Sequence, residues 1–389
     1  MNRTAPLVAG VGMTKFGRHP ERSTRSLATQ AVNEALEDAG LQVSDVQAAY
    51  VGNSVEGLVT GQESIRGQVA LRETGLLGVP IFNVENACSS GSSAFHLAWQ
   101  GVASGMLDCV LAVGFEKLVM PDKRLAFRAF DSTMDLTEMR VKYPAPSAER
   151  SVYMDHYAEY EPTADGIALL AHIAAKNHKH GSLNPLAQFQ QAYTAEEVLA
   201  SRSIVGPLTL FMCAPLSDGA AAAVLVSDKL ARRRGTSGVS VSASVMVSGT
   251  GDSDRPRAVP RAVGAAYEAA SLGPSELHLV ELHDATALAE YELYSDIGLC
   301  EAGEEGRLFD TGEVCLGGLR PVNPSGGLIA RGHPIGATGM AQIVEVTNQL
   351  RGRCGGRQVD RAQIGLTQNV GGLLGSDVAS ATAHILQVW

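Results

Sequence analysis

The sequence predicts an α/β fold built around a mostly parallel sheet with helices on both faces. Short apolar runs rich in Val, Ile and Ala alternate with longer stretches of helical periodicity. This alternation is typical of strands that crossover helices bury on both faces. The chain has 389 residues, of which 45% are hydrophobic, so it is long enough for two domains of ordinary size or one large body in two parts.

The first elements follow this alternation in order. We expect a strand at 6–13 (PLVAGVGM), a helix at 24–40 that ends at a glycine, and a second strand at 48–53 (AAYVGN). The stretch SDVQAAYVGNS at 44–54 has a counterpart in SELHLVELHDA at 275–285, because in each a serine, an acid and an aliphatic residue precede a strand and a polar loop. The sequence therefore predicts a duplicated α/β unit.

The regular alternation stops between about residues 119 and 213, where Pro, Met, Tyr and Arg become frequent. A long irregular segment in a compact enzyme is more often a lid or a binding loop than a neutral connection. We therefore expect an inserted cap at 119–213. It would divide an N-terminal half, formed by 1–118 and 214–245, and precede a C-terminal half at 246–389.

Charge and hydropathy exclude several classes of partner. Asp and Glu number 41 against 31 Lys and Arg, a formal charge of −10, so no overall basic field attracts nucleic acid or an anionic membrane surface. The longest apolar stretches fall far short of the roughly 20 residues that a membrane helix needs. The chain starts without the pattern of a secretory signal, and ILQVW at its end is no peroxisomal address. We expect a cytoplasmic protein with no membrane span.

One of the six cysteines differs from the others in its surroundings. Their spacing fits neither a zinc site nor a disulfide framework, so we expect reduced thiols and no bound metal. Five resemble ordinary small core residues, but Cys88 lies in NACSSGSSA between a predicted strand and a predicted helix. Free N–H groups and the dipole at a helix start favour a thiolate and lower its pKa. The alternative is a buried cysteine beside a tightly packed helix.

Two loops offer histidines. His333 lies in the glycine-rich NPSGGLIARGHPIGATG at 323–339, where a neutral imidazole can take a proton from a thiol near neutral pH. A purely structural histidine in a tight turn is the alternative. His283 and Asp284 follow a predicted strand in ELHDAT, at the carboxyl end where open α/β sheets collect ligands. Alternatively, Asp284 caps the next helix and His283 only packs.

A fourth loop, TQNVGG, offers the amides of Gln368 and Asn369 and a backbone bent by glycines. A thiol, a base and donors for an oxyanion are what nucleophilic acyl transfer requires. KNHKHG at 176–181 suggests a metal site, but its lysines repel cations, so we expect a solvated or phosphate-facing loop there. No nucleotide-phosphate or complete dinucleotide motif occurs.

Taken together, these motifs resemble the thiolase superfamily, and within it the sterol-carrier-protein type and its bacterial and archaeal relatives. The matching stretches occur in the family's order along nearly the whole chain: GVGMTKFG, NACSSGSSA, VLAVGFEK, KNHKHGSLNP, SDGAAAAVLVS, ELHDAT and NPSGGLIARGHPIGATG. The resemblance implies two similar α/β halves in a five-layered α-β-α-β-α body, an inserted loop domain and a homodimer.

The resemblance also implies roles for individual residues. Cys88 matches the acyl-accepting nucleophile, His333 the base that activates it, and His283 a polar residue that contributes to an oxyanion site. The N–H groups of Cys88 and Val370, with Gly371 beside them, match a second oxyanion hole. Coenzyme A would enter as a thioester substrate, with no bound cofactor.

The chain departs from the family at the second catalytic cysteine. Gln368 stands where ordinary thiolases carry the cysteine of a C-x-G motif, and Ala285 stands where the sterol-carrier type has the cysteine of HDCF. An amide is no base near neutral pH. The group that deprotonates a second acyl chain would then be His283, a thiol from elsewhere, or nothing.

The sequence is compatible with three functions. The first is a thiolase that cleaves a 3-oxoacyl-CoA or condenses acyl groups through acyl-Cys88, and the second is a condensing acyltransferase of a specialised pathway. The third is a thiolase-like subunit that needs a small OB-fold partner to bind acyl-CoA. The cap's aromatic residues face either a bulky lipid or the cap's own core: Phe127, Phe130, Tyr143, Tyr153 and Tyr157.

Overall fold

The structure, a computed structural model, describes residues 5–142, 151, 154, 157–158 and 160–389. The N-terminal half contains β1 (Leu7–Met13), α1 (Thr24–Ala39), β2 (Ala48–Gly52), α2 (Glu56–Thr60), α3 (Arg66–Ala70), β3 (Ile81–Val84), α4 (Ser90–Ala103), β4 (Cys109–Glu116), β7 (Gly219–Val226) and α9 (Asp228–Arg234).

The remaining elements form the segment before β7 and the C-terminal half. The first group is α5 (Lys123–Asp131), α6 (Leu136–Lys142), α7 (Ala164–Ser182), α8 (Ala195–Ala200), β5 (Ser203–Val205) and β6 (Leu208–Thr209). The second is β8 (Val239–Ser248), α10 (Ala258–Ala270), β9 (Leu279–Glu281), α11 (Ala287–Asp296), α12 (Glu305–Asp310), α13 (Gly327–Arg331), α14 (Thr338–Leu350), β10 (Ile364–Leu374) and β11 (Asp377–Val388).

Nine strands form one mixed sheet in the order β3-β2-β4-β7-β1-β8-β11-β10-β9. The predicted parallel character holds only at the two ends, where β3, β2 and β4 run parallel, as do β9 and β10. The central pairings, from β4–β7 through to β11–β10, are antiparallel, so the prediction of a mostly parallel sheet is wrong. Because helices cover both faces of the sheet, parallel and antiparallel strands alike appear in the sequence as continuous apolar runs. Composition alone therefore cannot tell the direction of a strand.

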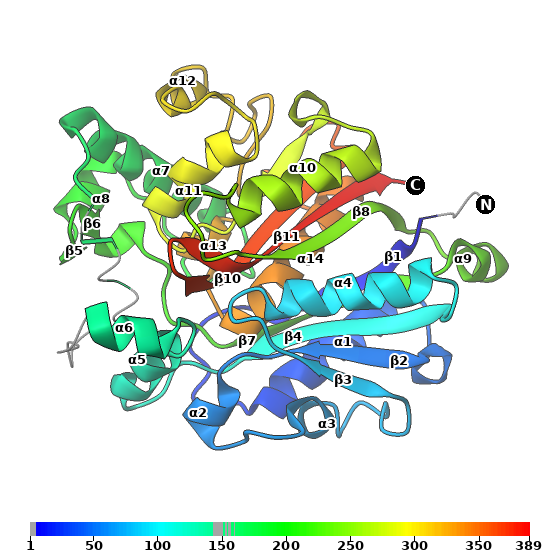
Figure 1. The fold of residues 1–389 in the computed structure, drawn as a ribbon. Coiled ribbons are helices and arrows are strands. Elements are labelled where there is room, and N and C mark those ends of the chain that lie inside the picture. Colours follow the sequence, from blue (N-terminus) through cyan, green and yellow to red (C-terminus); the bar gives the residue numbers. More distant parts are fainter. Residues whose placement is uncertain (1–4, 143–150, 152–153, 155–156, 159) are drawn as a thin grey trace.

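The layered architecture implied by the resemblance is confirmed. Figure 1 shows α1 on the outer face of the N-terminal strands and α10 on the outer face of the C-terminal strands. Helices α4 and α14 pack against each other and against strands of both halves, so they form the central layer. The two halves join where Leu7 and Val8 of β1 pair with Ser240 and Val239 of β8, so the boundary expected between residues 245 and 246 falls inside β8. The starts of α4 and α14 therefore meet between the halves.

The packing of α1 on β1 depends on glycine. A Cβ on Gly12 would lie 2.3 Å from the carbonyl oxygen of Ala31, and one on Gly10 would lie 2.2 Å from that of Ala35. Real Cβ atoms do not approach backbone oxygens so closely, so a side chain at either position would push the helix off the sheet. The interior is close-packed, and such a displacement loses contacts along the whole helix.

We expect Gly12→Ala to lower the free energy of unfolding by about 1–3 kcal/mol, the usual cost of overpacking a core. Gly264→Ala is the matched control, because Gly264 is an exposed residue of α10 where a Cβ meets no described atom within 4 Å. Removing a glycine from a helix interior there should stabilise the fold by up to about 1 kcal/mol. Urea unfolding measures both, and equal effects of the two substitutions would contradict the packing argument.

The segment between β4 and β7 contains helices that pack on the body. Phe130 of α5 packs against the apolar cluster that contains Cys88, and Tyr157 belongs to the core of the C-terminal half. Phe127 is half-buried, and the predictions for Tyr143 and Tyr153 lie outside the described residues. Among the helices in the described ranges, none is long and apolar enough to cross a membrane.

The KNHKHG stretch is helix and buried except for Lys179, so the prediction of a solvated or phosphate-facing loop is wrong. It lies in α7, where Lys176, Asn177 and His180 are all at most 6% exposed. The Lys176 ammonium lies 2.5 Å from the carboxylate of Glu290, and the ring of His180 hydrogen-bonds the carbonyl oxygen of Asn323. Both partners lie more than 100 residues further along the chain, so local sequence could not indicate the burial.

Candidate functional site

Cys88 lies in a tight turn between β3 and α4. Ala87 before it has φ 48°, in the left-handed region that residues with a Cβ rarely adopt. Hydrogen bonds hold this turn: the Glu85 carboxylate accepts the Ala87 N–H at 2.7 Å, and the Ser89 and Ser90 hydroxyls donate to the carbonyl oxygens of Asn86 and Ala87. The sharp turn fixes the direction in which the thiol points, as strained backbone at functional sites commonly does.

The thiol is buried and un-ionised in the free protein. Cys88 is 6% exposed, and burial first, with the nearby Glu116 carboxylate second, raises the pKa of its thiol to about 12. The N–H groups of Gly372 and of Cys88 itself oppose this rise. The expectation that the start of α4 lowers this pKa is therefore not met. Loss of solvation raises the pKa of the thiol by more than the N-terminus of the helix can lower it. Such a thiol needs a base to react near neutral pH.

Three side chains from distant parts of the sequence meet at this point. The sulfur of Cys88 and one ring nitrogen each of His283 and His333 all lie within 4.8 Å of one another. The two imidazole rings are nearly perpendicular, with centroids 5.3 Å apart. His283 follows the end of β9 and His333 lies between α13 and α14. The structure thus brings together the three residues that the sequence singled out.

A threonine determines which nitrogen of His333 carries a proton. The hydroxyl of Thr338 donates its one hydrogen to the carbonyl oxygen of Pro334 at 3.0 Å. At 2.7 Å from His333 Nδ1 the same hydroxyl oxygen can then only accept, so Nδ1 is the protonated nitrogen. His333 Nε2 therefore has a free lone pair, as a general base requires.

We expect Thr338→Val to lower kcat for acyl transfer about 10- to 100-fold with little change in KM. Valine has the shape of threonine but cannot accept a hydrogen bond from Nδ1–H, so the imidazole loses its orientation and its tautomer. Thr347→Val is the matched control, because Thr347 is buried in the same helix, α14, and its hydroxyl has no hydrogen-bond partner among the described residues. Steady-state kinetics of both variants test this; equal losses would contradict it.

His283 has the opposite tautomer, fixed by a chain of amides. Gln342 Nε2 donates to the carbonyl oxygen of Gln368 at 3.0 Å, which leaves Gln342 Oε1 to accept from Asn369 Nδ2 at 3.1 Å. The same Asn369 amide lies 3.0 Å from His283 Nδ1, which must accept its second hydrogen. Nε2 of His283 is then an N–H donor. This donor suits an oxyanion, and it suits neither a base nor a metal ligand.

The residue in the place of the missing cysteine is not the one expected. Counting back from Gly371 with C-x-G spacing reaches Asn369, and not Gln368 as the sequence comparison placed it. Side chains alternate along β10. Asn369 accordingly reaches the ring of His283, whereas the Gln368 side chain accepts the N–H of His283 at 3.2 Å.

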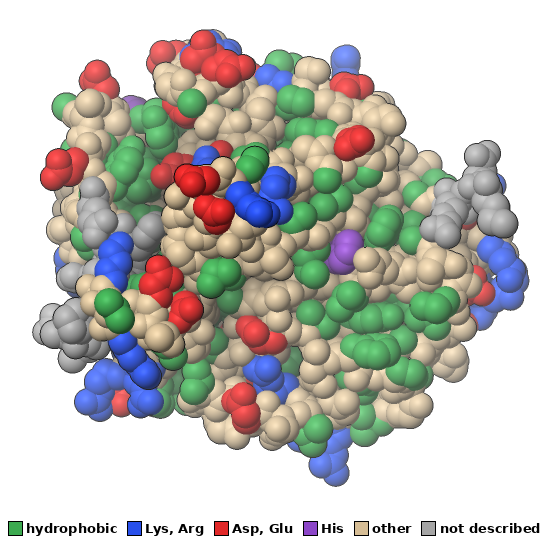
Figure 2. All heavy atoms as spheres, in the orientation of Figure 1, with side chains coloured by type: hydrophobic (Ala, Val, Ile, Leu, Met, Phe, Trp, Pro, Cys, Tyr) green, Lys and Arg blue, Asp and Glu red, His purple; other side chains and the backbone are tan. Residues whose placement is uncertain are grey.

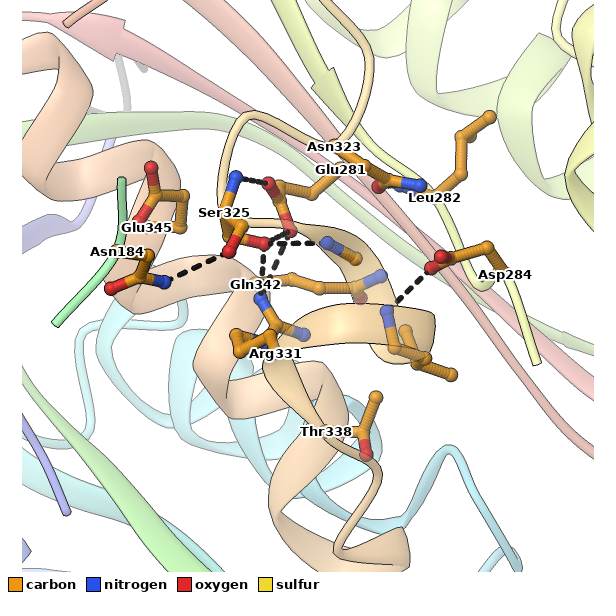
Figure 3. A network of polar contacts seen from close by, with 12 residues as sticks. Asn184, Glu281, Leu282, Asp284, Asn323, Ser325, Arg331, Thr338, Gln342 and Glu345 are labelled. Atoms are coloured by element: carbon orange, nitrogen blue, oxygen red, sulfur yellow. Dashed lines mark hydrogen bonds and ion pairs between the residues drawn. The ribbon is translucent and has the colours of Figure 1, made fainter. Parts of the chain in front are cut away.

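Both imidazoles are neutral at pH 7. Burial lowers the pKa of His283 to about 3, and the nearby Arg331 guanidinium lowers it further; burial, His283 and Arg331 hold the pKa of His333 well below its usual value. Arg331 is itself 1% exposed and pairs with the buried carboxylate of Glu281 at 2.9 Å, as Figure 3 shows. Figure 3 also shows Ser325 bonded to both members of this pair. The Glu281 carboxylate thus holds the Arg331 guanidinium near the two imidazole rings, and nothing in the motif around Arg331 had indicated this.

Asp284 has a structural position, but not the predicted one. Its carboxylate accepts the N–H groups of Leu328 and Ile329 and so caps α13, the helix that leads to His333. Figure 3 shows it directed at the start of that helix. The cap of α11, which the alternative interpretation gave to Asp284, is Thr286.

Glu116 was not singled out from the sequence, although it too ends a strand. Its carboxylate is fully buried and accepts hydrogen bonds from the N–H of Ser54 at 3.0 Å, the N–H of Gly336 at 3.1 Å and the Asn53 amide at 2.9 Å. Burial raises its pKa to about 7. The carboxylate thus ties the loop after β2 to the His333 loop, beside Cys88.

The backbone donors nearest the sulfur differ from those expected. The N–H groups that face the Cys88 thiol are its own and that of Gly372, rather than that of Val370. Gly372 has φ 67°, and the regular register of β10 with β11 is interrupted at this residue. A glycine can adopt this conformation without strain, which turns its N–H toward the site.

Comparison with known proteins agrees with this arrangement. Residues 7–229 match the family described as thiolase, N-terminal domain, and residues 239–387 the family described as thiolase C-terminal domain-like. The chain belongs to the thiolase family, and it is an acyl-CoA acyltransferase.

Several relatives align along almost the whole chain. An acetyl-CoA acetyltransferase of Methanothermobacter thermautotrophicus is 41% identical, covering 97% of this chain and 98% of that protein. The benzoylsuccinyl-CoA thiolase subunit BbsB of Thauera aromatica is 37% identical, covering 94% of each. Sterol carrier protein 2 of Bos taurus is 38% identical, covering 95% of this chain and 70% of that protein. The solved Ltp2-ChsH2(DUF35) aldolase shares the fold, with a TM-score of 0.75, 22% identity and coverage of 99% and 98%.

Proposed function

We propose that this protein transfers acyl groups through a thioester on Cys88, with a 3-oxoacyl-CoA as the substrate of thiolysis and coenzyme A as acceptor. One observation carries the proposal: a buried thiol, an imidazole with a free Nε2 and an imidazole with a protonated Nε2 lie within 4.8 Å of one another. These are a nucleophile, a base and an oxyanion donor close enough together to act on one bound thioester. Coenzyme A enters as substrate, and no further cofactor is invoked.

In the first half-reaction His333 Nε2 takes the proton of the Cys88 thiol as the sulfur attacks the 3-oxo carbon. The oxygen that becomes negative is stabilised by N–H donors, for which His283 Nε2 and the backbone at Cys88 and Gly372 are available. The bond between carbons 2 and 3 then breaks. Its electron pair takes the proton from His333, which releases acetyl-CoA and leaves the remaining acyl group on Cys88.

In the second half-reaction His333 takes the proton of incoming coenzyme A. The coenzyme A sulfur attacks the acyl carbon, the Cys88 sulfur leaves, and His333 returns the proton to it. His283 cannot share this work as a base, because Nδ1 accepts from Asn369 and Nε2 is protonated. We therefore assign every proton transfer to His333, and the absent second cysteine is not needed in the thiolytic direction.

Mass spectrometry of the intact protein tests this proposal. Incubation with acetoacetyl-CoA should place one acetyl group on Cys88, identified by peptide mapping, and added coenzyme A should remove it. Cys213→Ala should still be acetylated, whereas Cys88→Ala should not. A folded protein that shows no adduct, or an adduct on another cysteine, would sink the proposal.

A second proposal concerns assembly with a small acyl-CoA-binding subunit. The relative in Thauera aromatica is described as a thiolase subunit, and the solved structure with the same fold is described as an Ltp2-ChsH2(DUF35) aldolase. If this chain also needs such a partner, the pure protein should form acyl-Cys88 slowly and cell extract should accelerate it. Equal activity of the pure chain and the extract would exclude the requirement.

We also propose a homodimer through the edge of the sheet at β3. This edge strand has Phe82 48% exposed, with Leu77 beside the strand 51% exposed. Figure 2 shows hydrophobic side chains gathered on the face that carries β3 and α4. An unpaired apolar edge is a template for pairing with another strand. Sedimentation should give twice the monomer mass, and Phe82→Lys should shift the protein toward monomer.

A further inference from the structure

A row of buried polar side chains connects α4 of the central layer to strands β8 and β11 of the C-terminal half. Ser92 and His96 lie on α4, Ser244 on β8, and Thr382 and His384 on β11. All five are at most 8% exposed. None of them touches Cys88, His283 or His333 through a hydrogen bond that the structure describes, so the proposed reaction does not account for them.

The side chains form a continuous series of hydrogen bonds. His96 Nδ1 lies 2.9 Å from Ser244 Oγ, and Ser244 Oγ lies 2.8 Å from His384 Nδ1. His384 Nε2 lies 2.8 Å from Ser92 Oγ, which lies 2.5 Å from Thr382 Oγ1. The near end of the series is thus at Thr382 and the far end at His96.

The near end determines the direction of the first hydrogens. Thr382 Oγ1 lies 3.2 Å from the carbonyl oxygen of Asn369, which can only accept, so the threonine hydrogen points there. The Ser92 hydroxyl must then donate to Thr382, and His384 must donate from Nε2 to Ser92.

The remaining hydrogens follow from these. His384 Nδ1 has a free lone pair, which accepts the Ser244 hydroxyl hydrogen. Ser244 accepts from His96 Nδ1, and His96 Nε2 accepts from the amide of the exposed Gln100 at 3.0 Å. Every hydrogen therefore points the same way, from Gln100 at the surface to the carbonyl of Asn369. Hydrogen bonds aligned in this way in a low dielectric strengthen one another.

The inner part of this hydrogen-bonded series runs from Ser92 to Asn369. Both of these residues belong to the framework of the candidate active site. Helix α4, which carries Ser92, begins two residues after Cys88. Asn369, at the other end, is the residue whose amide fixes the tautomer of His283. The series thus connects the helix that presents the nucleophile to the residue that orients the proposed oxyanion donor.

We propose that Ser92, Ser244 and His384 are positioning residues for acyl transfer. Their aligned hydrogen bonds hold β10 against α4, so that Asn369 keeps the Nε2–H of His283 directed at the carbonyl bound at Cys88. The effect on rate rests on the proposed function, whereas the effect on the tautomer of His283 does not.

The test uses Ser244→Ala, which breaks the series far from Cys88. We expect kcat to fall about 3- to 10-fold with KM within twofold, and Ser244→Thr, which keeps the hydroxyl, to restore it. Ser242→Ala is the matched control on the same strand, since the Ser242 hydroxyl donates only to the Ile385 carbonyl among the described residues. It should leave kcat unchanged.

Nitrogen NMR of histidine-labelled protein gives the second readout, with the His283 signals assigned from their loss in His283→Gln. The wild type should show His283 protonated on Nε2 alone, and Ser244→Ala should show both tautomers. The proposal is overturned if Ser244→Ala matches Ser242→Ala in kcat, or if the His283 tautomer is unchanged. If the wild type transfers no acyl group, the proposed function fails. The comparison of the His283 tautomer between the wild type and Ser244→Ala still tests the positioning role.

Discussion

Cys88→Ala is expected to abolish acyl transfer, with a loss in kcat of at least about 10⁴-fold, the scale seen when a covalent nucleophile is removed. No other thiol can replace it, because Cys88 is the only cysteine that shares the site with His283 and His333 among the described residues. The fold should persist. The substitution removes one sulfur atom from a turn that backbone and hydroxyl hydrogen bonds hold in place.

The matched control is Cys109→Ala. Cys109 is also buried, with a pKa raised to about 12 by burial, but it lies in β4 within the core of the N-terminal half. Its substitution should lower the melting temperature without lowering kcat. The single-turnover rate of acyl transfer, measured with both variants at equal folded fraction, separates the two effects. Comparable rate losses in both would show that the nucleophile lies elsewhere.

The sequence allowed most of the architecture to be predicted, and its errors have identifiable causes. The strands of the first half were predicted because apolar runs and helix ends are local signals, as at Gly40 at the end of α1. Strand direction is a property of distant pairing. β7, for instance, lies between β4 and β1 and is antiparallel to both, although all three are equally apolar.

The sequence singled out the three residues that meet at the candidate site, but it did not predict the electrostatics there. Cys88, His283 and His333 were expected to meet because polar loops at strand ends gather at one edge of the sheet. The pKa of the thiol could not be predicted, because it depends on burial by residues from other elements and on the Glu116 carboxylate. The role of Asn369 depends on the alternation of side chains along β10, where an error of one residue selects the opposite face.

His333→Gln is expected to lower the rate of Cys88 acylation about 10²- to 10⁴-fold at pH 7, the contribution of a well-placed general base. With a pKa of about 12, only about one thiol in 10⁵ is ionised at that pH without help. In the wild type the thiol loses its proton to His333 during attack. A resting thiolate–imidazolium pair is disfavoured, since burial holds the pKa of His333 well below its usual value.

The sign of the pH dependence distinguishes a lost base from a damaged fold. In His333→Gln the Cys88 thiol must lose its proton to the solvent before it attacks. Acylation should therefore accelerate about tenfold for each pH unit between 7 and 10, where the thiolate is still the minor form. The wild type should be nearly flat over that range, because His333 is already unprotonated. Stopped-flow acylation with acetoacetyl-CoA measures both profiles. Parallel profiles would mean that another group takes the thiol proton, and Glu116 would then be the carboxylate to test.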